Sequence, residues 1–249
     1  MKQQWLIGDS REVLKAVSGV NLVITSPPYN VGMEYEKPLS LEEYEHFLTE
    51  VYSACYNAMV DNSRICVNIP YNMTHPDGKI FNPYIHNYNA LMKSGFKYRE
   101  TITWNQNNSD NDTAWGSWCS PSAPWLRHQT EVIIVMYKGE WKLNRKGETD
   151  LTRDTFLKYV VDIWSMSVAR RKENGHPAPF PEELPIRCMK LFSYVGDLVL
   201  DPFLGRGTTL RACRLTNRNG IGIEINPKYE KELREWSYAD IPPLEVYCR

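Results

Sequence analysis

The chain has 249 residues, 42% hydrophobic and 24% charged, with a formal net charge of −1. This composition is that of a globular protein with one sizeable core, and it excludes disordered and collagen-like chains. A net charge near zero also excludes nucleic-acid binding through the whole surface, so any such binding depends on local patches.

The six cysteines stand apart, with no C-x-x-C pair, which argues against a zinc site. No signal peptide is visible, which argues against a disulfide framework as well. No apolar run approaches the roughly 20 residues of a membrane span. We therefore expect a soluble, cytoplasmic protein without a metal site or a membrane contact.

Strands and helices alternate through the first hundred residues. The patterns predict strands at 4–9, 21–26, 64–69 and 98–105, and helices at 10–17, 40–60 and 88–96, the last ended by Gly95. In helix 40–60, Ser40 and Glu43 form a capping box. The core face of this helix has helical spacing and consists of Leu41, Tyr44, Phe47, Leu48, Val51, Tyr52 and Cys55.

Two stretches in the middle of the chain lack this regularity. Residues 105–128 are rich in Asn, Ser, Pro and Trp and predict a long loop, and loops of such length in compact domains are usually functional. Residues 138–172 carry nine Lys and Arg against five Asp and Glu. An apolar strand is predicted between the two stretches, at 131–139.

The last part of the chain returns to alternation. We predict a helix opened by proline at 179–196, strands at 197–203 and 220–225, and helices at 207–216 and 227–236. Together the elements predict an α/β fold with one doubly wound, mostly parallel sheet and helices on both faces. We expect a single domain over residues 1–249.

The stretch DLVLDPFLGRGTTL predicts a ligand site at the end of a strand. The strand ends at Asp201, Gly205 and Gly207 bracket a turn, and Thr208 opens a helix. Glycine lets the backbone approach a ligand closely, and the amino terminus of a helix offers free N–H groups. About twenty residues later Glu224 ends another strand, where an acidic residue accepts hydrogen bonds from ribose hydroxyls. The combination favours a nucleoside-like cofactor over a plain tight turn.

The glycine pattern also narrows the class of cofactor. No Gly-Lys-Ser/Thr follows, so the loop is not a P-loop. Leu210 stands where G-x-G-x-x-G would have its third glycine, which disfavours an NAD enzyme. A nucleotide-binding oxidoreductase stays the alternative from another class.

The stretch NLVITSPPYN places a stiff polar loop at the end of a strand. Pro27 and Pro28 preset φ and have no N–H. If the loop grips a flat aromatic amine, Tyr29 stacks on the ring while the Ser26 hydroxyl and a proline carbonyl accept the amine N–H bonds. Such a grip localises the nitrogen lone pair and aims it at an electrophile. Pro-Pro is also a common strand breaker, so the loop alone is equally consistent with a plain turn.

Both stretches resemble motifs of the DNA methyltransferases that modify exocyclic amines with S-adenosylmethionine. The amine motif of that family is matched by Ser26, Pro27, Pro28 and Tyr29. The cofactor loop is matched by Asp201, Pro202, Phe203, Gly205, Gly207 and Thr208. The amine motif precedes the cofactor loop, as in the β class of the family, which implies a circularly permuted form of the Rossmann-like methyltransferase sheet.

The resemblance covers nearly the whole chain. It implies that Asp9 and Ser10 contact the adenine of the cofactor, that Glu224 binds the ribose, and that His176 in GHPAPFP lies around the methionine moiety. Phe203 is expected to pack on the cofactor or on the target base, with core packing as the alternative. The target base has to leave the DNA stack to reach Tyr29.

The choice of base follows from the first position of the amine motif. In this family, serine there is more often associated with cytosine and aspartate with adenine. We therefore predict a cytosine-N4 DNA methyltransferase, with adenine N6 as the alternative and RNA as a further one. The family also implies a restriction-modification system with a cognate restriction endonuclease. The sequence leaves the oligomeric state open between monomer and homodimer.

Recognition of double-stranded DNA is expected outside the two motifs. The β class places target recognition just before GHPAPFP, which corresponds to a short insert at 138–175. The candidate DNA contacts are Arg170, Arg171 and Lys172 in this insert and Trp115, Trp118 and Arg127 in the 105–128 loop. A solvated basic turn and plain loop anchors are the alternatives. A catalytically dead DNA-binding module would have no need of Ser26 and Tyr29.

Overall fold

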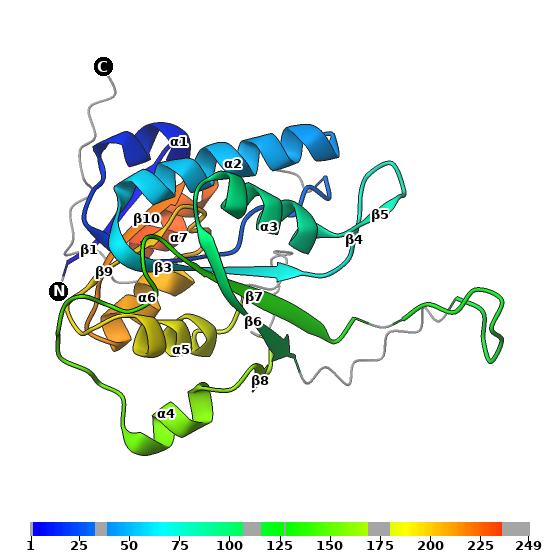
Figure 1. Ribbon diagram of the computed structural model, residues 1–249. Helices are drawn as coiled ribbons and strands as arrows, with labels where there is room; N and C mark the ends of the chain where they lie inside the picture. Colours follow the sequence, from blue (N-terminus) through cyan, green and yellow to red (C-terminus); the bar gives the residue numbers. More distant parts are fainter. Residues whose placement is uncertain (1, 33–38, 107–115, 127, 169–179, 236–249) are drawn as a thin grey trace.

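An eight-stranded sheet runs through the molecule in the order β1-β10-β9-β2-β3-β7-β6-β8 (Figure 1). The structure is a computed structural model that describes residues 2–32, 39–106, 116–126, 128–168 and 180–235. The strands of the sheet are β1 (Gln3–Ile7), β2 (Val20–Thr25), β3 (Met59–Pro70), β6 (Lys97–Asn105), β7 (Thr130–Tyr137), β8 (Ile163–Ser165), β9 (Leu198–Asp201) and β10 (Asn219–Glu224). A separate hairpin consists of β4 (Met73–Thr74) and β5 (Ile80–Phe81).

The sheet is mostly parallel, as predicted. The strands β1, β10, β9, β2 and β3 are parallel neighbours, β7 is antiparallel to β3 and β6, and β8 is parallel to β6. As a consequence, all strands except β7 end at the same edge of the sheet, and β7 begins there. We call this edge the carboxyl edge.

Helices cover both faces of the sheet, so the predicted α/β fold is confirmed (Figure 1). One face carries α1 (Ser10–Val13), α2 (Leu41–Ala58) and α3 (Pro83–Lys93), and the other carries α5 (Glu183–Phe192) and α6 (Thr208–Leu215). Strand β2 serves both layers, because Val23 packs in the first layer while Leu22 and Ile24 pack in the second. Side chains alternate along a strand, so a strand covered on both faces is apolar throughout.

The ends of the helices follow from their capping residues. The predicted capping box of α2 is present: the Glu43 N–H donates to the Ser40 hydroxyl at 3.2 Å, and the Glu43 carboxylate accepts from the Ser40 N–H at 2.9 Å. Helix α3 begins five residues earlier than its predicted start at 88, since Asn82 caps it and Pro83 occupies its first turn. Beyond β10, a 3-10 turn (Pro227–Tyr229) leads into α7 (Glu230–Glu235), and another (Leu14–Ala16) extends α1.

The 138–172 stretch contains two elements that its sequence pattern did not predict. These are α4 (Arg153–Tyr159) and β8, which pairs with β6 and buries Trp164 completely. Both are too short for periodicity to reveal them. Helix α4 also buries none of its side chains, so it has no apolar face to recognise.

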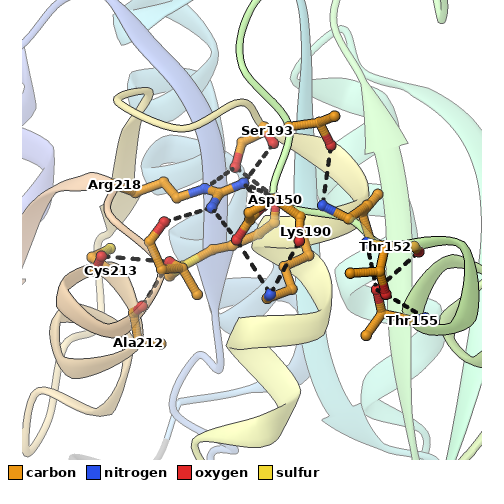
Figure 2. Close-up of polar contacts among 12 residues, drawn as sticks. Asp150, Thr152, Thr155, Lys190, Ser193, Ala212, Cys213 and Arg218 are labelled. Atoms are coloured by element: carbon orange, nitrogen blue, oxygen red, sulfur yellow. Dashed lines mark hydrogen bonds and ion pairs between the residues drawn. The ribbon is translucent and has the colours of Figure 1, made fainter.

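A buried arginine attaches this stretch to the core (Figure 2). Arg218 is 0% exposed and donates to the Asp150 carboxylate at 2.9 Å and to the Ser193 carbonyl at 2.9 Å. Lys190 lies 3.3 Å from the same carboxylate. Burial raises the pKa of Asp150, but the hydrogen bond and charge of Arg218, with help from Lys190, hold it below its usual value. The 138–152 segment is therefore fixed to α5 and to the start of β10.

Three classes of feature are absent from the ranges described above. None of the helices there is both long and apolar enough to cross a bilayer. The same residues form no cluster of three His, Cys, Asp or Glu side chains that could hold a metal ion. The five cysteines they include are free thiols.

Candidate active site

The Ser-Pro-Pro-Tyr motif leaves the carboxyl end of β2 as a constrained turn. The Ser26 and Tyr29 hydroxyl oxygens lie 2.7 Å apart and share a hydrogen bond. The Tyr44 hydroxyl of α2 donates to the Pro28 carbonyl at 2.8 Å. Asn30 then adopts a left-handed backbone with φ of 58°, and its side chain hydrogen-bonds the backbone nine residues later. These contacts hold the serine and tyrosine side chains in one orientation.

Tyr29 carries its hydroxyl into an enclosed polar environment. Burial raises the pKa of the phenol well above its usual value, and the negative charge of Glu131 raises it further. Hydrogen bonds with Ser26 and Asn68 act in the opposite direction. The phenol therefore stays neutral at physiological pH, and it can exchange hydrogen bonds but cannot serve as a phenolate base.

Asp201 ends β9 directly beside the amine motif. Its Oδ1 accepts hydrogen bonds from the Thr25 hydroxyl at 2.8 Å and from the Phe203 N–H at 3.1 Å, and its Oδ2 accepts from the Thr209 hydroxyl at 2.6 Å. Burial raises the pKa of Asp201 to about 6, against the effect of these hydrogen bonds. With 1% of its surface exposed, Asp201 supports the glycine loop from beneath and ties it to β2.

The glycine loop has one open side and one packed side. Gly205 has a φ of 54°, and a Cβ placed there would meet no described heavy atom within 4 Å. Gly207 has a φ of 85°, and a Cβ there would lie 2.9 Å from Leu233 of α7. The Gly205 N–H donates to the Glu224 carboxylate at 2.8 Å, and the Asn226 N–H donates to its other oxygen at 2.8 Å. The loop, Thr208 at the start of α6 and the end of β10 thus form one rigid unit.

The Gly-Asp-Ser segment after β1 contacts the same loop. The Ser10 hydroxyl donates to the Pro202 carbonyl at 2.5 Å, which joins residues 192 positions apart. Asp9 caps α1 by accepting from the Arg11 N–H at 2.9 Å. The Arg11 guanidinium also binds the Asp9 carboxylate and holds its pKa below the usual range. The segment that the resemblance assigned to the adenine and the glycine loop therefore lie side by side.

The Phe203 ring packs against the core and is also partly exposed. It packs against Phe47 of α2 with the ring centroids 6.0 Å apart, and it belongs to the edge of the core between the sheet and α1–α3. The ring is only partly buried. Core packing and contact with a ligand are thus compatible for this residue.

Strand order arranges all these groups in a row along the carboxyl edge. Glu224 ends β10, the glycine loop follows β9, the amine motif follows β2, Asn68 lies near the end of β3, and Glu131 lies at the start of β7. Ligands of open α/β sheets bind outside the carboxyl ends of the strands. The edge therefore has a cofactor side, toward β10, and a substrate side, toward β7.

The comparison with protein families decides the class of this site. A family model for N6/N4 methyltransferases, described as DNA methylase, matches residues 20–235. That range includes the amine motif, the glycine loop and Glu224. This chain belongs to the N6/N4 DNA methylase family. The resemblance seen in the sequence is thereby confirmed, and the protein is a DNA methyltransferase that acts on exocyclic amines.

Similar curated proteins are named as type II methyltransferases. The methyltransferase is 35% identical to M.MjaVI of Methanocaldococcus jannaschii over 157 residues. This match covers 62% of this chain and 80% of the relative. It is 30% identical over 237 residues to M.ScaI of Streptomyces caespitosus, which covers 89% of this chain and 77% of the relative.

Solved structures of similar proteins have the same fold as this chain. A putative DNA modification methylase of Thermus thermophilus, complexed with S-adenosylmethionine, has 27% identity and a TM-score of 0.75, and the match covers 97% of each chain. The cytosine-N4-specific PvuII DNA methyltransferase has 20% identity and a TM-score of 0.73 over 94% of this chain and 85% of its own, a likeness in fold alone. The methyltransferase therefore uses S-adenosylmethionine, as predicted.

The residues on the cofactor side fit this molecule. The open side of Gly205 leaves room for a ligand, and the buried Glu224 carboxylate beside it is an acceptor suited to ribose hydroxyls. Predicted cofactor residue His176 lies outside the described residues. S-adenosylmethionine supplies an electrophilic methyl group when bound.

The predicted DNA contacts are only partly described. Trp118 is 70% exposed in a hairpin that a bridge between Gly116 and Pro124 closes. Trp115, Arg127, Arg170, Arg171 and Lys172 lie outside the described residues. The exposed hairpin carries two further large apolar side chains, Trp125 and Leu126, that were not among the predicted DNA contacts.

Four polar residues of the site were not found from the sequence. Thr25 and Thr209 bind Asp201, and Asn68 and Glu131 lie next to Tyr29. For Thr25, Asn68 and Glu131 the available signal was a polar residue inside or at the end of an apolar strand, whereas Thr209 lies in α6 and has no such signal. Such residues are common at strand ends, and only the pairing of the strands shows that these side chains meet.

Proposed function

We propose that the methyltransferase transfers a methyl group to N4 of cytosine in double-stranded DNA, after the target base has left the stack. The observation that carries this proposal is the neutral Ser26 hydroxyl, held 2.7 Å from the Tyr29 hydroxyl and next to the cofactor loop. Serine is the shortest residue used at this motif position, and it leaves the side chain uncharged. The small size of serine favours the smaller of the two aminated rings.

The amine is held by groups of the motif turn. The Ser26 hydroxyl accepts one of its N–H bonds, and the Pro27 carbonyl accepts the other. We assign Pro27 because the Pro28 carbonyl already accepts from Tyr44. The Tyr29 ring stacks on the base, which leaves the nitrogen lone pair pointing toward the cofactor side of the edge. Fixed orientation of this kind lowers the barrier to in-line attack.

Glu224, Asp9, Ser10 and His176 keep the roles that the resemblance implied, and we assign the glycine loop to the methionine moiety as well. Glu224 binds the ribose, the Asp9–Ser10 segment borders the adenine, and the loop from Asp201 to Thr208 with His176 surrounds the methionine moiety. Asp201 acts through the loop, because its carboxylate is fully enclosed. The loop amides and the start of α6 favour the negatively charged carboxylate of that moiety.

DNA recognition is assigned to two segments, one between β6 and β7 at the carboxyl edge and one after β7, which β8 returns to that edge. They are the hairpin that carries Trp118, together with Trp115 and Arg127, and the 138–175 insert with Arg170, Arg171 and Lys172. We propose that this single-domain enzyme works in the cytoplasm beside a cognate restriction endonuclease. The names of its relatives as type II methyltransferases support that assignment.

The test is methyl transfer from labelled S-adenosylmethionine to unmodified duplex DNA of random sequence, with the product digested to nucleosides and identified by mass. N4-methylcytosine is the expected product. N6-methyladenine would keep the geometry and overturn the choice of base. Label in an RNA substrate, with none in DNA, would overturn the proposed substrate.

A further inference from the structure

Glu131 is an acidic side chain on the substrate side of the carboxyl edge. It lies one residue into β7, opposite Pro70 of β3 and Trp104 of β6. Its carboxylate accepts hydrogen bonds from the Asn68 amide at 2.6 Å and from the Gln106 amide at 3.0 Å. Both donors are neutral, so they orient the carboxylate without neutralising its charge.

Glu131 differs in its partners from Asp150 and Asp197, whose carboxylates hold segments of the fold together. Asp150 binds Arg218 and Lys190, and Asp197 binds Arg145. Glu131 has no basic partner among the described residues, and burial raises its pKa above the usual range against the effect of its two amide donors. Enclosing a carboxylate without a cation is unfavourable for stability. Groups of this kind gather at functional sites, where the charge has a use.

The neighbouring side chains connect Glu131 to the amine motif. Asn68 is 2% exposed, and its amide lies between the Glu131 carboxylate and the Tyr29 hydroxyl. Its Oδ1 is buried and accepts no hydrogen bond from any described residue. Tyr29 in turn shares its hydrogen bond with Ser26. A continuous polar chain therefore runs from Glu131 to the serine that grips the amine.

We propose that Glu131 is a positioning residue for methyl transfer, which holds the Asn68 amide against Tyr29 and places a negative charge beside the reacting amine. The inference rests on the proposed function and deepens it. Ser26 is neutral, so the amine motif has no charge of its own to offset a cation. Glu131 supplies that charge from the neighbouring strand.

The chemistry of the step explains the need for this charge. The amine lone pair forms the new N–C bond as the methyl–sulfur bond breaks, and sulfur keeps the electron pair of that bond. The nitrogen becomes positive and then releases one proton to water. A carboxylate placed beforehand near this nitrogen stabilises the positive charge as it forms. Only the ionised form of Glu131 has this effect.

The pH dependence follows from the groups that face Glu131. These are Asn68 and Pro70 on β3, Trp104 on β6 and Gln106 just after β6, none of which titrates. On the motif turn it is Tyr29, which stays neutral. As pH falls through the raised pKa of Glu131, the carboxylate gains a proton and kcat falls. Asp201 titrates near pH 6 in every variant, so comparing variants isolates the contribution of Glu131.

The test compares Glu131→Gln with the wild type in the methyl-transfer assay on the random-sequence duplex. We expect kcat at neutral pH to fall at least about tenfold in E131Q, since both charge and alignment are changed. The fall in kcat at acid pH that is due to protonation of Glu131 should be absent from the pH profile of E131Q. The Kd for S-adenosylmethionine should stay near wild type, and the Tm should not fall, because the variant removes an enclosed charge. Glu100→Gln, which removes an exposed glutamate from the neighbouring strand β6, should change none of these values.

A double-mutant cycle with Asn68→Ala supplies a second measurement. If Glu131 acts through Asn68, E131Q combined with N68A is hardly worse than the more damaging single variant, whereas additive losses would contradict the inference. Wild-type kcat in E131Q across the pH range would overturn it, and so would a loss confined to Tm or to cofactor binding. Failure of the proposed function is a separate result, because the wild type itself would then yield no methylated nucleoside.

Discussion

At the scale of single residues, the amine motif depends on hydroxyl groups held in place by neighbours. Ser26 and Tyr29 bind each other, and Tyr44 of α2 fixes the intervening turn through the Pro28 carbonyl. The motif is therefore preorganised in the folded protein. Its residues lie beside the cofactor loop, but they form no part of that loop.

We expect Ser26→Ala to lower kcat about 100-fold, because the amine loses one acceptor of its grip. Tyr29→Ala should be at least as damaging, since the stacking surface is lost as well. Cofactor affinity, measured by titration calorimetry, should stay near wild type for both. Tyr84→Phe removes another hydrogen-bonded tyrosine hydroxyl and serves as the control. Full activity in S26A would show that the amine is held in another way.

The raised pKa of Asp201 predicts that the stability of the folded protein depends on pH. The pKa of Asp201 is raised from 3.8 to about 6 in the folded state. Between these two pH values the Asp201 carboxyl group is ionised in the unfolded chain but still protonated in the folded protein. Stability from this group is thus highest below pH 4 and falls by about 3 kcal/mol as pH rises through 6. In Asp201→Asn this dependence should vanish, as measured by Tm from pH 4 to 7 relative to the wild type.

Asp154→Asn, which changes an exposed aspartate, is the matched control and should follow the wild-type curve. A wild type and a D201N variant with parallel Tm curves would contradict the assigned titration. D201N should also bind S-adenosylmethionine more weakly, because the amide cannot accept from Thr25, Thr209 and Phe203 as the carboxylate does.

At the scale of elements, the 138–152 segment is a strap across the layer formed by α5 and α6. Arg218 and Lys190 bind Asp150 (Figure 2). Arg145 binds Asp197, and the Val195 N–H donates to the Glu148 carbonyl at 2.9 Å. The strap leads into α4 and β8, and β8 returns the chain to the carboxyl edge. The position of the following insert residues thus depends on a buried ion pair.

We expect Asp150→Ala to lower the free energy of unfolding by about 3 kcal/mol, because it leaves the Arg218 guanidinium buried without its counter-ion. Urea unfolding followed by circular dichroism measures this loss. Arg153→Ala removes an exposed ion pair on α4 and should have almost no effect. Equal stability of D150A and the wild type would show that the carbonyl oxygens around Arg218 are enough to hold its charge.

At the scale of the whole molecule, the loops that leave the carboxyl edge lie far apart in sequence. The hairpin at 116–126 projects away from the sheet, and its exposed Trp118 and Trp125 do not belong to any of the core clusters (Figure 1). Hydrogen bonds within the hairpin shape its tip, including one from the Ser117 N–H to the Ala123 carbonyl at 2.9 Å. An ordered tip with large exposed aromatic rings suits stacking on bases.

We expect Trp118→Ala to weaken binding to duplex DNA about tenfold, with no change in the dependence of affinity on salt concentration, because stacking involves no counter-ion release. Fluorescence anisotropy at several salt concentrations measures both quantities. The Tm and cofactor affinity should be unchanged. Ile80→Ala, at another exposed apolar position, is the control. Unchanged DNA affinity in W118A would remove this residue from the interface.

Local patterns made a large part of this protein predictable. An apolar strand followed by Ser-Pro-Pro-Tyr or by Asp-Pro-Phe-x-Gly-x-Gly-Thr is a signal contained within a dozen residues, and it indicated both motifs and the cofactor. Helix α2 was predictable for the same reason, since its capping box and apolar face are local. The elements that were missed include α4, β8 and the two strands of the β4–β5 hairpin, all of which are too short to show a period.

The sequence by itself determined the motifs, the α/β class and the cofactor, because each rests on chemistry between near neighbours in the chain. Only the tertiary structure decided which groups meet. Strand pairing places Thr25 beside Asp201 across 176 positions and Asn68 beside Glu131 across 63. A single polar residue in an apolar strand has no local signature of its partner. Its partner is set by strand order and register, which depend on packing of the whole core.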